Sequence, residues 1–188
     1  MTREEFIEIL DEKGYYYEIE GDKVVVTHGR EVNLSEFESI PSNIEFRCLS
    51  DVRLRTLITL GPDVVFNNDG DVLLGALKTI SQGVEFNNKG ALLLSSLETI
   101  SPGVIFSNEG GIYLDDLKYL NNGIEFNGDL DVYFRNLKTI SPGVIFNNRG
   151  GVYLHPLIKG GFHYWEGNIE GIDNKGLLNL MINKGVFI

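Results

Sequence analysis

One spacing dominates this sequence: large apolar residues recur every 20 positions along most of the chain. Phenylalanine forms one such column, at Phe46, Phe66, Phe86, Phe106, Phe126 and Phe146. Three further columns are Leu54, Leu74, Leu94, Leu114, Phe134 and Leu154; Leu57, Leu77, Leu97, Leu117, Leu137 and Leu157; and Ile40, Leu60, Ile80, Ile100, Leu120 and Ile140. A fixed period of this length predicts stacked, near-identical units that bury their apolar side chains only against neighbouring units.

Each unit contains two segments that predict short strands with one buried face, such as residues 84–86 (V-E-F) and 72–74 (V-L-L). An Asn-Asn-x-Gly stretch lies between them, as at Asn67–Gly70, and both residue types tolerate the positive φ angles of a corner. Ser101–Gly103 (S-P-G) exemplifies a turn in the other connection. The sequence therefore predicts a mainly β repeat solenoid, leucine-rich-repeat-like or a β-helix, of about six to seven coils.

The residues before the repeat predict an N-terminal cap over positions 1–31. Thr2–Glu5 has the pattern of a capping box and begins an apolar-faced helix that Gly14 would end. Alternating segments on either side of Gly21-Asp22 predict a β-hairpin. Val24–Val26, in its second arm, could already belong to the first coil.

The repeat solenoid itself is expected over residues 32–158. It fails after Leu157, where an aromatic stretch at 162–165 (F-H-Y-W) interrupts the pattern. Residues 159–188 predict a C-terminal cap with a short helix, for which Asp173 is the candidate N-terminal residue. Helical caps at both ends would cover coils that otherwise expose unpaired strands.

Composition narrows the classes of function. The chain has 16 Lys and Arg against 27 Asp and Glu, a formal net charge of −11, which disfavours direct binding of nucleic acid. Residues 1–51 carry 13 of the acidic and 5 of the basic side chains. Neither a membrane-length apolar run nor a signal peptide is visible, and Cys48 is the single cysteine. We therefore expect a cytoplasmic protein with no membrane partner.

No catalytic signature is present, and we expect neither an enzyme nor a bound cofactor. His28, His155 and His163 have no suitably spaced carboxylate, and Cys48 has no indicated base. Residues 67–71 (N-N-D-G-D) resemble part of a calcium loop, but the position of Asp69 becomes Lys, Glu or Arg in other units. We therefore expect no metal site.

The informative positions are those that point outward from the V-x-L strand. If Val72 and Leu74 point inward, Leu73 points outward, and its equivalents form a row. The candidate binding residues of this row are Leu73, Leu93, Tyr113, Tyr133 and Tyr153. Exposed rows of this kind mark contacts between proteins, but tyrosine ladders also stabilise parallel sheets by stacking, and both interpretations stay open.

The equivalent outward row of the V-x-F strand alternates between acidic and aliphatic residues. Its members are Glu45, Val65, Glu85, Ile105, Glu125 and Ile145. Alternating acids interrupt an apolar strip and oppose aggregation. We expect this face to be mainly solvated.

Residues 97–106 and 137–146 (L-x-T-I-S-P-G-V-I-F) carry a resemblance to a known family. Over residues 32–158 the repeat resembles bacterial and phage leucine-rich-repeat-like proteins with 20-residue units. It differs from the common leucine-rich repeat because Leu77, Leu97 and Leu117 occupy the column in which that repeat keeps a buried Asn. The resemblance implies a binding role, names no ligand, and leaves a straighter β-solenoid as an alternative to a horseshoe.

The sequence therefore predicts a non-catalytic protein–protein interaction module that uses the row from Leu73 to Tyr153. The partner is a protein of unknown identity, in a bacterial or phage-infected cell, and a homodimer is a special case. Two alternatives remain: a glycan-binding solenoid with tyrosines stacked on sugar rings, and an acidic inhibitor from a phage or mobile element that mimics nucleic acid.

Overall fold

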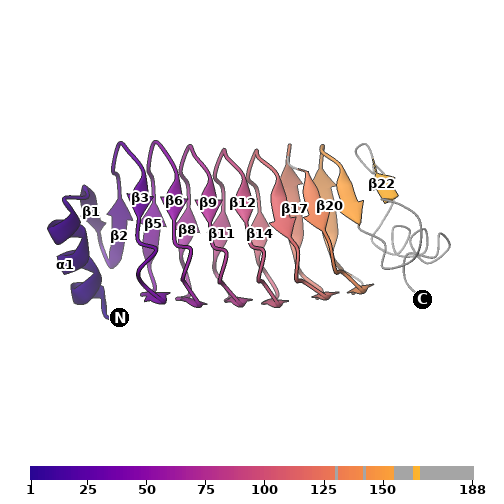
Figure 1. Cartoon of the computed structure of the whole chain (residues 1–188), viewed down its shortest axis with the longest axis horizontal. Coiled ribbons are helices and arrows are strands. Elements are labelled where there is room, and N and C mark those ends of the chain that lie inside the picture. The colour runs from indigo at the N-terminus through magenta and orange to yellow at the C-terminus, as the bar shows by residue number, and fades with distance from the viewer. Residues whose placement is uncertain (130, 142, 155–162, 166–188) are drawn as a thin grey trace.

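The computed structural model describes residues 1–129, 131–141, 143–154 and 163–165. They form one helix, α1 (Arg3–Lys13), followed by a stack of short strands. The coils lie side by side in a straight row, and α1 covers the N-terminal end (Figure 1). The predicted mainly β solenoid is confirmed. Its coils stack along a straight axis and do not curve into a horseshoe.

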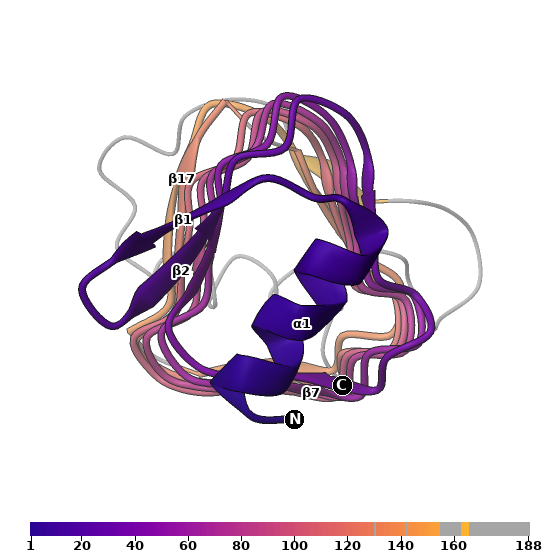
Figure 2. The same ribbon diagram turned by 90° about the vertical axis from the view of Figure 1, so that its left-hand side faces the viewer.

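Viewed along the row, the coils superpose into a three-sided outline (Figure 2). Face 1 is one sheet of eight strands: β1 (Tyr17–Glu20), β2 (Lys23–Val26), β5 (Ile44–Phe46), β8 (Val65–Phe66), β11 (Glu85–Phe86), β14 (Ile105–Phe106), β17 (Glu125–Gly128) and β20 (Ile145–Asn148). Face 2 has the sheet β3 (Val32–Asn33), β6 (Val52–Arg53), β9 (Val72–Leu73), β12 (Leu92–Leu93), β15 (Ile112–Leu114), β18 (Val132–Phe134), β21 (Val152–Leu154) and β22 (His163–Trp165).

The sequence did not predict the third side. Face 3 consists of the two-residue strands β4 (Ser39–Ile40), β7 (Thr59–Leu60), β10 (Thr79–Ile80), β13 (Thr99–Ile100), β16 (Tyr119–Leu120) and β19 (Thr139–Ile140), which pair in twos. They lie in the stretch that we expected to be a connection. In the face 3 strands from β4 to β16 the second residue is apolar and buried, as Ile80 is, and in β7, β10, β13 and β16 the first residue is exposed, as Thr79 is.

Equivalent residues of successive coils pair in parallel and in register, as the 20-residue period requires. Phe86 of β11 pairs with Phe66 of β8 on one side and with Phe106 of β14 on the other. From Phe46 to Phe146, neighbouring phenylalanine rings of this column are stacked, with centroids 4.9 to 5.3 Å apart and planes within 8°. All six phenylalanines of this column belong to the hydrophobic core.

A buried asparagine column lines the corner after face 1, at Asn68, Asn88, Asn108 and Asn148. The Nδ2 atom of Asn88 donates to the carbonyl oxygen of Gly90 at 2.8 Å and to that of Gly70, one coil earlier, at 3.4 Å. These bonds supply a donor to partly buried carbonyl groups of the corner. Cys48 occupies the same column, and its Sγ donates to the carbonyl oxygen of Val26 at 3.5 Å.

The predicted N-terminal helix and its end signals are confirmed. Thr2 and Glu5 form a capping box, Gly14 adopts the left-handed conformation that ends the helix, and Phe6 and Leu10 are buried against the first coil.

The predicted hairpin is also present, as the antiparallel pair β1–β2. Strand β2 pairs in parallel with β5, so Val24–Val26 does belong to the stack. The hydroxyl oxygen of Tyr15 accepts a hydrogen bond from the N–H of Asn33 at 3.0 Å. This bond pairs a backbone donor of β3, the edge strand of face 2.

At the other end, β22 pairs with β21 in the antiparallel sense, with Tyr153 opposite Tyr164. The predicted C-terminal helix beginning at Asp173, and His155, lie outside the described residues.

Candidate functional site

The five predicted binding residues come together in one row on the outer side of face 2. Leu73 pairs with Leu93, Leu93 with Tyr113, Tyr113 with Tyr133 and Tyr133 with Tyr153. The residues on either side of Leu73 are fully buried, whereas Leu73 itself is only half-buried, so its side chain points outward. We call these five residues the Leu/Tyr ladder.

The three tyrosines of the ladder stack on one another. The ring centroids of Tyr113 and Tyr133 are 4.8 Å apart, and those of Tyr133 and Tyr153 are 4.5 Å apart, with nearly parallel planes in both pairs. The hydroxyl of Tyr133 also donates to Oδ2 of Asp131 at 3.3 Å. Burial, the negative charge of Asp131 and the adjacent tyrosines raise the pKa of Tyr133 to about 12. The stacking that the sequence left as one interpretation is therefore real.

Gly111, two positions before Tyr113, makes room for the rings of Tyr113 and Tyr133. A Cβ atom placed on Gly111 would lie 3.3 Å from a ring carbon of Tyr133 and 3.5 Å from one of Tyr113. The rings of Tyr113 and Tyr133 thus lean over Gly111 instead of standing upright from the sheet. The corresponding sequence pattern is Gly-x-Tyr, which occurs at Gly111–Tyr113 and Gly151–Tyr153 and could have indicated these leaning rings.

The ladder remains accessible despite this packing. Tyr113 is 38% exposed, whereas Tyr133 and Tyr153 are half-buried. Charged residues border it: Arg135 lies 3.6 Å from the carboxylate of Asp115. An apolar centre with a charged border is the usual composition of a protein interface.

At its N-terminal end the row stops at a charged residue. Arg53 occupies the next outward position and forms ion pairs with Glu31 at 2.8 Å and with Asp51 at 3.3 Å. The apolar part of face 2 thus begins at Leu73, the next coil along the stack.

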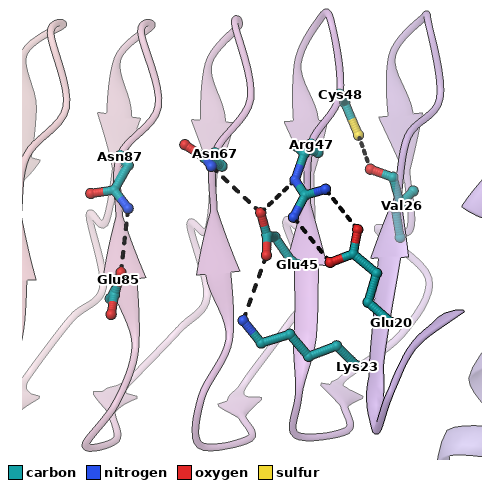
Figure 3. Close-up of polar contacts among 9 residues, drawn as sticks. All are labelled: Glu20, Lys23, Val26, Glu45, Arg47, Cys48, Asn67, Glu85 and Asn87. Carbon is teal, nitrogen blue, oxygen red and sulfur yellow. Dashed lines mark hydrogen bonds and ion pairs between the residues drawn. The ribbon is translucent and has the colours of Figure 1, made fainter. Parts of the chain in front are cut away.

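The outward row of face 1 differs from the expected solvated surface at its first member. Glu45 is only 6% exposed, and Lys23 of the hairpin, Arg47 of its own coil and Asn67 of the next coil contact its carboxylate (Figure 3). Its carboxylate lies 2.7 Å from Nε of Arg47 and 3.6 Å from Nζ of Lys23, and Arg47 also pairs with Glu20 at 3.0 Å. The prediction of a solvated side chain was wrong for Glu45, although Glu85 is exposed.

This cluster connects the cap to the stack, because Glu20 and Lys23 belong to the hairpin and Glu45 and Arg47 to the next coil. Burial alone would raise the pKa of Glu45, but hydrogen bonds from Arg47 and Asn67 and the charges of Arg47 and Lys23 outweigh it, so that the pKa is lowered. The carboxylate is therefore ionised at neutral pH and holds the hairpin in place.

The calcium-like stretch at 67–71 uses its polar groups within the fold. The carboxylate of Asp69 pairs with Lys89 at 2.7 Å, and Oδ1 of Asp71 accepts from the N–H of Ala91 at 2.8 Å. Among the described residues, no three His, Cys, Asp or Glu side chains lie close enough to hold a metal ion. Burial raises the pKa of the Cys48 thiol to about 12, which leaves it unreactive at neutral pH.

The part of the chain that the structure describes contains no helix of the length and apolarity needed to cross a bilayer. No protein-family model, curated protein or solved structure matches the chain, so the Leu/Tyr ladder must be interpreted from its own geometry and chemistry.

Proposed function

We propose that the chain is a non-catalytic protein-binding module and that the Leu/Tyr ladder is the centre of its contact surface. The observation that supports this proposal is the row itself, in which consecutive coils present large side chains in register on one flat face. The solenoid orders these side chains before any partner arrives, which lowers the entropic cost of association.

The dimensions of the ladder fit the central part of an interface. Four coil steps of about 4.8 Å separate Leu73 from Tyr153, so the row is roughly 19 Å long. A row of this length covers a few hundred Å², whereas a stable interface buries about 800 Å² on each partner. The flanking columns, including Asp115 and Arg135, therefore complete the contact, and the tyrosines supply its desolvated centre.

The partner that fits is a protein with an apolar centre and a basic border, because the chain carries a net charge of −11. A second copy of the chain is a special case. We place the interaction in the cytoplasm of a bacterium or a phage-infected cell. The free, buried thiol of Cys48 agrees with a reducing compartment.

The sharpest variant for a test is Tyr113→Ser. Tyr113 is the most exposed tyrosine of the ladder, and within the described residues its hydroxyl bonds no carboxylate, unlike that of Tyr133, which donates to Asp131. A Tyr133→Asp variant would place a second carboxylate beside Asp131 and confuse destabilisation with lost binding. Tyr119→Ser is the matched control, because Tyr119 is 57% exposed but lies on face 3.

Proteins captured from native cells by the unmodified chain should be retained by Tyr119→Ser and lost with Tyr113→Ser. Equal retention by both variants would remove the ladder from the proposal. Binding to a glycan array that depends on Tyr113 would assign the ladder to sugars. Capture that weakens steeply with salt but ignores Tyr113 would favour a nucleic-acid mimic.

A further inference from the structure

A separate hollow lies at the N-terminal end of the stack. Its volume is about 440 Å³, and it is lined by Tyr16, His28, Gly29 and Arg30. Pockets for small molecules commonly measure about 300 to 1,000 Å³. The ring of Tyr16 stands beside it with 71% of the residue exposed, which is the largest exposed fraction of any large hydrophobic residue described.

The hollow lies at the first coil, where no preceding coil offers an acceptor to the backbone N–H of the corner. In later coils the N–H at this corner donates to the preceding coil: that of Asp69 reaches the carbonyl of Cys48 at 2.9 Å. Lys89 donates to Asn68 in the same way at 3.0 Å. Gly29 is the equivalent residue of the first coil, and within the described residues its N–H has no acceptor. Gly29 is exposed, and apart from its chain neighbours no heavy atom lies within 4 Å of where its Cβ would be.

Two side chains add positive charge and a further donor. Arg30 is exposed and forms no ion pair with any described residue, although the cap around it is acidic. The N–H of Tyr16 donates to Nδ1 of His28 at 3.5 Å, so a neutral His28 carries its proton on Nε2. The His28 ring is held between Tyr15 and Tyr16, with centroid distances of 4.9 and 5.5 Å.

We propose that this hollow binds a small ligand that carries one phosphate group and a planar ring, the chemistry of a mononucleotide. The phosphate accepts from the N–H of Gly29, the guanidinium of Arg30 and Nε2 of His28, because backbone donors and arginine together form anion sites. The planar ring stacks on Tyr16. The acidic balance of residues 1–51, with 13 acidic against 5 basic side chains, selects a short anion over a polyanion.

The test is a calorimetric titration of the full chain with adenosine 5′-monophosphate, with inorganic phosphate and adenosine as separate probes. Arg30→Gln should weaken binding of the monophosphate about tenfold or more, and Tyr16→Ser about fivefold or more. The matched controls are Arg135→Gln and Tyr119→Ser, which alter an arginine and an exposed tyrosine away from the hollow. Both controls should bind as the unmodified chain does.

The monophosphate should also bind more tightly than either inorganic phosphate or adenosine, because only it engages both halves of the hollow. Absence of binding at about 10 mM monophosphate would overturn the proposal. It would also be overturned if the controls weakened binding as much as Arg30→Gln, or if adenosine bound equally well. A 5′-phosphorylated oligonucleotide that bound more tightly would contradict the preference for a short anion. None of these results bears on the Leu/Tyr ladder.

Discussion

Replacing Phe86 by alanine tests whether the phenylalanine column holds the coils together. Phe86 is fully buried, and its ring stacks on Phe66 and Phe106 with centroids 5.2 and 5.3 Å away. The loss of this buried ring and the cavity left behind should cost about 3–5 kcal/mol of unfolding free energy. This range includes the two stacking contacts, worth about 0.5–1.5 kcal/mol each.

Urea unfolding followed by circular dichroism measures the cost, and two variants separate its causes. Phe86→Leu refills most of the volume without an aromatic ring and should cost about 1–2 kcal/mol. Phe146→Ala, whose residue is 8% exposed and lies near the end of the described stack, should cost less than Phe86→Ala. A cost below about 1 kcal/mol for Phe86→Ala, or one smaller than that of Phe146→Ala, would refute the reasoning.

Three further predictions concern polar groups. Tyr133 keeps its proton more firmly when folded, so stability should fall as the pH rises from about 10 through about 12, and an absorbance titration should show that Asp131→Asn lowers its pKa. The pKa of Glu45 is lowered by folding, so stability should fall as the pH drops below about 4.5, and urea unfolding at several pH values should show a smaller acid-induced loss for Glu45→Gln. Asn88→Ala removes the side-chain donor to the carbonyl of Gly90, whereas the carbonyl of Gly70 keeps its bonds from Asn68 and from the N–H of Gly90, and the variant should cost about 1–3 kcal/mol in urea unfolding; a cost near zero would show that the asparagine column is dispensable.

The repeat made most of the fold predictable, because each column must stack on itself. A residue such as Phe86 can lie only above Phe66 and below Phe106 once the period is known, so strand direction and register follow together. The outward direction of Leu73 followed from alternation alone. The row of candidate binding residues was therefore placed correctly in space, while its role as a binding surface remains a prediction.

The features that the sequence did not reveal depend on few residues or on contacts outside the repeat. The strands of face 3 are two residues long, as at Thr79–Ile80, and too short to show an alternating pattern. Glu45 is buried by Lys23 of the hairpin and by Arg47. Neither residue recurs at the equivalent position of later coils, so comparing the columns of the repeat could not predict this burial. The hollow beside Gly29 lies at the first coil, at the end of the stack. The sequence of a single repeat unit does not show which coil comes first, so the repeat pattern could not predict the hollow.

The in-register pairing of every coil also bears on how such a chain can evolve. Removing the stretch from Asp71 to Gly90 would bring Ala91 where Asp71 stood and leave every remaining column aligned. Gain or loss of one whole unit thus lengthens or shortens the outer face by one coil and preserves the local geometry of the remaining coils. A lineage could in this way fit its recognition surface to partners of different length without redesigning the interior.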